Sequence, residues 1–213
     1  MQSVIRLFFS LTVSTVLICC SNSPDKKNER TTGAPGSFDE PAFKNKIIES
    51  LKDLHSVLAS KDKNAIAAIF SFPLPEEDAE LSANDPALAN KIKQNNGRIS
   101  KDIFLDYFET FYHSLNMARI INVLEEADTD SLLYTNQVTK EITNNLLPCT
   151  SYYTVELDKE SVTLEFGTNT NSEYAAGNSS SADSDVDGCE YMTRWLLKFD
   201  GEKLAFNKQV SAG

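Results

Sequence analysis

Three carboxylates alternate along an acidic segment late in the chain. Asp183, Asp185 and Asp187 are separated by single residues, and Gly188 follows them. Oxygen ligands at alternate positions before a glycine are typical of loops that wrap around Ca²⁺. A complete loop also carries a bidentate Glu further on, where this chain has Arg194. The segment therefore fits either a calcium site or a solvated acidic loop, and we expect no other cofactor.

The chain contains only two histidines, the usual general bases near neutral pH. At helical spacing, His113 points away from the apolar stripe of its segment, whereas His55 lies at the boundary of its own stripe. Tyr107, Tyr112 and Trp195 could join His55 in lining a ligand pocket, or could pack in the core. No serine-hydrolase elbow, zinc-protease motif or phosphate-binding loop occurs. We therefore expect no catalytic residue. If the domain is instead a small enzyme, His55 or a buried Asp would be its general base.

Two adjacent cysteines end an apolar run near the N-terminus. The run from Leu7 to Ile18 follows Arg6 and has the length and single basic flank of an export signal, too short to span a bilayer. The sequence LICC that ends at Cys20 resembles the bacterial lipobox, in which a cysteine is acylated and the chain is cut before it. Cys20 has the small Cys19 before it, so residues 1–19 are predicted to be a lipoprotein signal peptide. An ordinary cleaved signal or an N-terminal membrane anchor is the alternative.

The segment after Cys20 is polar. From Ser21 to Ser37 it reads SNSPDKKNERTTGAPGS, without a hydrophobic residue to bury, so residues 20–37 are predicted to be a lipidated flexible tether. A coil of about 17 residues would hold a domain roughly 20–25 Å from its anchor. The lipobox resemblance implies attachment in the cell envelope, on the periplasmic or cell-surface side. Because Ser21 is not the Asp that retains some lipoproteins at the inner membrane, the outer membrane is preferred.

Cys149 and Cys189 are the remaining cysteines, an even number that suits an oxidising compartment. We predict a disulfide between them, with two free buried thiols as the alternative. A zinc site is disfavoured because no second Cys or His lies near either residue. Closing a loop of about 40 residues would stabilise the domain by roughly 3–4 kcal/mol in the chain-entropy model.

Helical periodicity dominates the first half of the remaining chain. Apolar spacing predicts a helix over residues 40–60, and Asp62 is placed to cap a shorter second helix. A polar connection with one helical turn over residues 86–93 follows. Ser100 then caps a predicted third helix with a narrow aromatic stripe. The stripe consists of Phe104, Phe108, Phe111 and Leu115.

After about residue 130 the hydrophobic period changes from 3.6 to 2, which indicates strands. Residues 153–166 predict one hairpin, turned at residues 158–160, and residues 191–206 predict a second, turned at Asp200-Gly201. A further strand over residues 132–139 could complete the sheet. An antiparallel order would place Cys149 and Cys189 at the same end of it.

Composition supports one folded unit and limits its partners. Hydrophobic residues make up 41% of the chain and charged residues 24%, as in ordinary globular proteins. We expect residues 38–213 to form a single α+β domain, with N-terminal helices packed on a curved antiparallel sheet of about four strands. The net charge of −11 argues against nucleic acid and against broad contact with anionic lipids. Membrane attachment would then depend on the N-terminal lipid.

The segment DLHSVLASKDKNAIAAIFSFP, from Asp53 to Pro73, is similar to the opening of nuclear-transport-factor-2-like, or cystatin-like, α+β cones. The order of elements over residues 40–210 extends the resemblance. It implies a sheet wrapped around a helix to leave a pocket. The superfamily includes isomerases, dehydratases, polyketide cyclases and non-catalytic modules, and its enzymes usually place an Asp, His or Tyr inside the cone.

These observations favour a membrane-anchored lipoprotein whose domain binds a protein or a small apolar ligand without catalysis. One alternative is a small cone-fold hydrolase or isomerase acting on an apolar substrate. The other is a structural or assembly component of the cell envelope, which would dock a sheet face or a helix on a partner and would expose an apolar patch.

Overall fold

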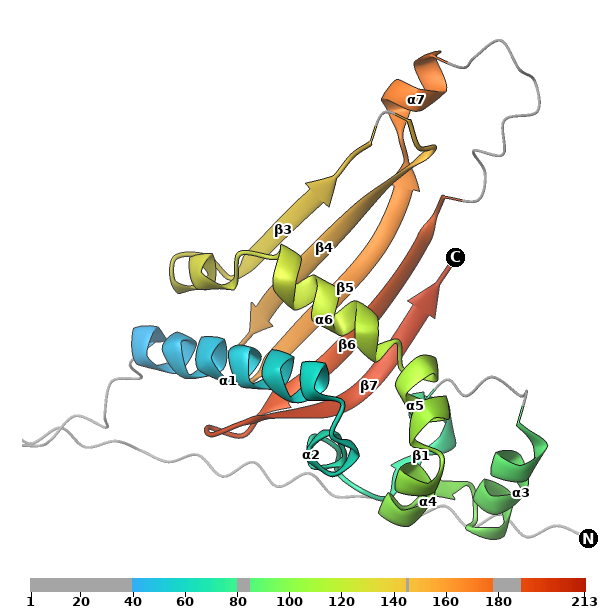
Figure 1. The fold of residues 1–213 in the computed structure, drawn as a ribbon. Coiled ribbons are helices and arrows are strands. Elements are labelled where there is room, and N and C mark those ends of the chain that lie inside the picture. The colour runs from blue at the N-terminus through green and yellow to red at the C-terminus, as the bar shows by residue number, and fades with distance from the viewer. Residues whose placement is uncertain (1–39, 80–84, 145, 178–188) are drawn as a thin grey trace, which may run out of the picture. The chain divides into compact units, whose positions relative to one another are not determined.

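A five-stranded antiparallel sheet carries helices on one of its faces (Figure 1). The computed structural model describes residues 40–79, 85–144, 146–177 and 189–213. These residues belong to one compact unit that spans Asp39–Gly213. The α+β class predicted from the sequence is confirmed.

The first helices follow the predicted pattern closely. Helix α1 spans Glu40–Ser60 and buries Ile47, Leu51 and Leu54. The Asp62 carboxylate accepts hydrogen bonds from the backbone N–H groups of residues 64 and 65 and so caps α2 (Lys63–Ala67). These hydrogen bonds lower the pKa of Asp62 because they stabilise its charged form.

A small two-stranded ribbon follows α2. Strand β1 (Leu74–Pro75) pairs with β2 (Arg98–Ile99). Between them lie the 3₁₀ helix η1 (Glu76–Ala79) and helix α3 (Pro86–Gln94), which Asp85 caps. The predicted turn over residues 86–93 is therefore a helix of nine residues.

The aromatic stripe occupies two helices, so the prediction of one continuous third helix is wrong. Ser100 caps α4 (Lys101–Asp106), Tyr107 leaves helical geometry, and α5 (Phe108–Ser114) follows. No proline or glycine causes this break, and both halves still bury aromatic rings. Phe104 stacks on Phe111 at 5.0 Å between ring centroids and also packs against Phe70. The long-range packing of Phe104 against Phe70 therefore outweighs the local preference of this segment for one straight helix.

Helix α6 (Met117–Glu126) follows Asn116, which adopts a left-handed conformation with φ of 50°. The chain then forms the 3₁₀ helix η2 (Thr129–Leu133) and enters the sheet. The predicted strand over residues 132–139 therefore begins later than expected. In a strand, residues 132 and 134 would lie on the same face, but Leu132 is fully buried within η2 and Tyr134 is 87% exposed. These residues therefore belong to the turn before the strand.

The sheet has five strands rather than about four, in the order β3-β4-β5-β6-β7. Each strand pairs antiparallel with the next one along the chain. Helix α7 (Ser172–Gly177) follows the third strand in this order. The strands are β3 (Gln137–Ile142), β4 (Cys149–Asp158), β5 (Ser161–Thr170), β6 (Tyr191–Phe199) and β7 (Leu204–Ala212).

The space between helices and sheet is filled by side chains. Trp195 is completely buried, and its indole N–H lies 2.8 Å from the Leu115 carbonyl oxygen and 3.0 Å from Gln209 Oε1. A cavity between α1, α6 and the sheet, lined by residues such as Leu54 and Ile120, has a volume of only about 10 Å³. This part of the interior has no room for a substrate.

Candidate functional site

One end of the sheet extends beyond the helices that cover the rest of it. Figure 1 shows α1 and α6 lying across the sheet, while β3, β4 and β5 continue past them toward α7. The strand register aligns one residue from each strand on the helix-bearing side of this extension. We call this row and the neighbouring Tyr191 the open face. The row consists of Lys140, Tyr153, Phe166, Thr193 and Ser211.

Aromatic rings form the centre of the open face. The rings of Tyr153 and Phe166 lie 5.4 Å apart, and those of Phe166 and Tyr191 lie 6.5 Å apart. Arg119 reaches down from α6, with its guanidinium carbon 4.2 Å from the Phe166 ring centroid and 5.9 Å from that of Tyr191. A planar guanidinium on a ring keeps its N–H edges available for a carboxylate or phosphate. The arrangement can thus offer apolar contact and a cation side by side.

Hydroxyl groups continue the open face toward β7. The Thr193 side chain is fully buried, and its oxygen is hydrogen-bonded to the Tyr191 hydroxyl and lies 3.2 Å from Ser211 Oγ. At the β3 edge, Lys140 Nζ donates to Glu126 Oε2 at 2.7 Å. This ion pair neutralises Lys140, so Arg119 supplies the positive charge at the rings.

The opposite face of the sheet is polar and built around a glycine. Gly167 faces Tyr152 across the β4–β5 pair, and a Cβ atom at position 167 would overlap the Tyr152 ring. Burial and the neighbouring Glu165 raise the pKa of Tyr152. Arg194 forms an ion pair with Glu165. The raised pKa keeps the Tyr152 phenol protonated at neutral pH.

His55 has an acidic partner that the sequence did not reveal. Its Nε2 lies 3.2 Å from Glu125 Oε1 on α6, although the two residues are 70 positions apart. His55 lines a depression of about 200 Å³ together with Leu51, Lys52, Leu124 and Thr129. Because the His55 side chain is 35% exposed and that of Glu125 is 56% exposed, the pair faces solvent and not the core.

The other proposed pocket residues are not brought together with His55. Tyr107 lies at the break between α4 and α5, under the Lys91 ammonium group at 5.2 Å from its ring centroid. Tyr112 is buried on α5, and burial raises its pKa. Trp195 is part of the core, as described above. His113 is exposed at the end of α5.

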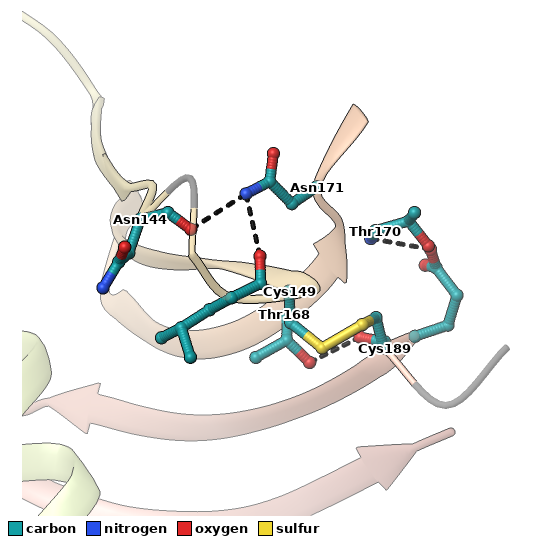
Figure 2. Close-up of a disulfide and its surroundings, with 8 residues drawn as sticks. Asn144, Cys149, Thr168, Thr170, Asn171 and Cys189 are labelled. Atoms are coloured by element: carbon teal, nitrogen blue, oxygen red, sulfur yellow. Dashed lines mark hydrogen bonds between the residues drawn. A yellow bond between two sulfur atoms is a disulfide. The ribbon is translucent and has the colours of Figure 1, made fainter. Parts of the chain in front are cut away.

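The predicted disulfide is present and fixes the free end of the sheet. Cys149, the first residue of β4, is bonded to Cys189, two residues before β6, with 5.4 Å between their Cα atoms (Figure 2). The strand between them, β5, pairs with both neighbours. Thr168 of β5 also donates a hydrogen bond to the Cys189 carbonyl oxygen. The bond therefore joins strands on either side of β5.

Two further sequence predictions lie outside the described residues. Cys20, the predicted lipidation site, precedes the described part of the chain, and Asp183, Asp185 and Asp187 fall between its last two segments. Among the described residues, no cluster of three or more His, Cys, Asp or Glu side chains could hold a metal ion. No helix of the described ranges is long and apolar enough to cross a membrane.

The residues of the open face were only partly visible in the sequence. Alternation identified Tyr153, Phe166 and Tyr191 as members of strand faces. Nothing in the local sequence of α6 assigned Arg119 to them, because that contact spans a large separation along the chain. Comparison of the chain with family models, with curated proteins and with solved structures finds no match.

Proposed function

We propose that this chain is an exported lipoprotein, anchored through Cys20 in the cell envelope, whose domain binds a ligand on the open face. The lipobox-like sequence supports the anchor, and the outer membrane is its proposed location. The observation that carries the binding role is the guanidinium of Arg119, on the exposed side of α6, held over the rings of Phe166 and Tyr191. The role is non-enzymatic.

The chemistry of the open face suggests the class of ligand. Rings at half-buried positions offer flat apolar contact, as Tyr153 and Tyr191 do. Arg119 adds a cation whose N–H edges suit a carboxylate, sulfonate or phosphate. The ligand is therefore an apolar or aromatic group that carries a negative charge, either as a small molecule or as a side chain of a partner protein.

The helix-covered face and the element order support a cystatin-like cone as part of this proposal. An enzyme of that class would place an ionisable group in a cavity inside the cone. The cavity described above is lined by apolar side chains and holds about 10 Å³, and His55 faces solvent beside Glu125. A binding surface at the edge of the cone is therefore better supported than an active site inside it.

Binding can be tested with 8-anilinonaphthalene-1-sulfonate, which combines aromatic rings with a sulfonate. We expect Arg119→Gln to weaken binding by the full-length chain about tenfold, because a hydrogen-bonded charged pair contributes about 1.5–3 kcal/mol. Lys198→Gln is the matched control, since Lys198 is an exposed cation on the other side of the sheet. Equal affinity for the two variants, measured by fluorescence titration, would contradict the proposed site.

The anchor has its own test. Palmitate labelling of the chain in a bacterial host should be lost in Cys20→Ala and kept in Cys19→Ala, because only Cys20 has a small residue before it and Leu17 three positions back. Membrane fractionation would accompany the labelling. A Cys20→Ala chain that is still labelled and membrane-bound would refute the lipoprotein assignment.

A further inference from the structure

The connection between β3 and β4 exposes apolar side chains at the free end of the sheet. Leu146 is 83% exposed, Leu147 is 52% exposed, and Ile142 at the end of β3 is 39% exposed. We call these three residues the hairpin tip. Single exposed hydrophobic residues are common on protein surfaces, but these three fall within six positions of the chain at the end of one hairpin.

The backbone of the hairpin tip is held firmly by a buried side chain. Asn171 is only 2% exposed, and its Nδ2 donates to the carbonyl oxygens of Asn144 at 3.1 Å and Leu147 at 2.9 Å (Figure 2). Its backbone N–H donates to the Pro148 carbonyl oxygen at 2.8 Å. The disulfide at Cys149 fixes the strand that follows. The fold thus presents the leucines on a fixed support instead of turning them inward.

We propose that the hairpin tip inserts into the surface of the lipid bilayer to which the chain is anchored. The inference rests on the proposed lipid anchor at Cys20. About 19 residues separate Cys20 from Glu40, so the start of α1 stays within roughly 65 Å of the lipid even if the connection is fully extended. The proposed anchor therefore keeps the domain close to a bilayer, which is an apolar phase that exposed leucines can enter.

Charges around the hairpin tip indicate which kind of bilayer surface it accepts. Glu141 follows Lys140 on β3, and Glu173 and Glu190 lie at the same end of the sheet, beside Asn171 and Thr170. Because Lys140 pairs with Glu126, it does not neutralise the negative charge of these carboxylates. Acidic side chains behind an apolar tip oppose anionic headgroups and tolerate zwitterionic ones. Insertion should therefore be deepest in zwitterionic lipid and weaker when anionic lipid is added at low salt.

Tryptophan probes in the full-length, anchored chain can test this inference. Leu146→Trp places an indole at the tip, and Tyr134→Trp places a control indole at a position that is 87% exposed at the other end of β3. Both variants retain Trp195, which is completely buried and contributes the same background. We expect lipids brominated on their acyl chains to quench the Leu146→Trp probe at least about threefold more than the control, because an indole at the tip would reach the membrane interface.

The outcomes separate the tip from the anchor. A chain that does not float with zwitterionic vesicles overturns the anchor and the inference that rests on it. A chain that floats but shows equal quenching for the two probes overturns the inference alone. Protection of the Leu146→Trp probe from aqueous iodide without quenching by brominated lipid would assign the tip to a protein contact and also overturn it.

Discussion

Breaking the Cys149–Cys189 bond should destabilise the domain by about 4 kcal/mol. The two cysteines are separated by 40 positions, and the chain-entropy model gives about that value for a loop of this length. The effect acts on the unfolded chain, because other contacts still hold the native end of the sheet. Asn171 binds the β3–β4 connection, and Thr168 binds the Cys189 carbonyl. The expected loss is a large part of the total stability of a typical domain, about 5–15 kcal/mol.

Urea unfolding of the Cys149→Ala/Cys189→Ala double variant, followed by Trp195 fluorescence, measures this loss. Wild-type protein treated with a reductant is the matched comparison, because its side chains are unchanged. Both samples should unfold at a similar, lower urea concentration and should share the native emission spectrum before unfolding. A loss below about 1 kcal/mol in both samples would show that the bond does not restrict the unfolded chain as the model assumes.

Three substitutions test other parts of the fold. Trp195→Phe should cost about 3 kcal/mol in urea unfolding, because it leaves two buried acceptors without the indole N–H and creates a cavity. Gly167→Ala should cost about 1–2 kcal/mol through overlap with the Tyr152 ring, and the cost should largely disappear in a Tyr152→Ala background if that contact is its cause. Asp62→Ala should lower the urea midpoint at pH 7. Because the folded-state pKa of Asp62 is lowered, its contribution exists above the unfolded pKa and is lost as the pH falls through the folded value, so the two proteins should converge in acid.

Local features of this fold could be read from the sequence because their causes are local. Asp62 caps α2 through hydrogen bonds to residues two and three positions ahead, and Asp200 accepts hydrogen bonds from the N–H groups of Glu202 and Lys203 in the β6–β7 turn. Strand alternation identified both hairpins for the same reason, since each strand pairs with its neighbour in sequence. The disulfide followed from an even number of cysteines together with this topology.

The rest depended on contacts between distant residues. The break at Tyr107 has no proline or glycine as a local cause, and it accompanies the packing of Phe104 against Phe70 and Phe72, which lie more than 30 positions earlier in the chain. The His55–Glu125 pair joins residues on different helices. Arg119 belongs to residues 117–126, which the sequence left either as a continuation of the third helix or as the start of a fourth, and the structure shows the separate helix α6. Element type could therefore be predicted, whereas the composition of the open face required the packing of α6 on the sheet.

The open face also explains a change of chemistry along each strand. At the helix-covered end, β4 and β5 point aliphatic side chains toward the core and β6 adds Trp195 and Phe199, whereas further along the same strand face carries tyrosines and hydroxyl groups. A hydroxyl is costly to bury unless it is hydrogen-bonded, and Thr193 meets that condition through Tyr191 and Ser211. Aliphatic side chains could continue along these strands only if another helix or strand covered them. Phe166 and Thr193 are buried, so Tyr153 and Tyr191 supply the half-buried ring area that the proposed ligand would contact.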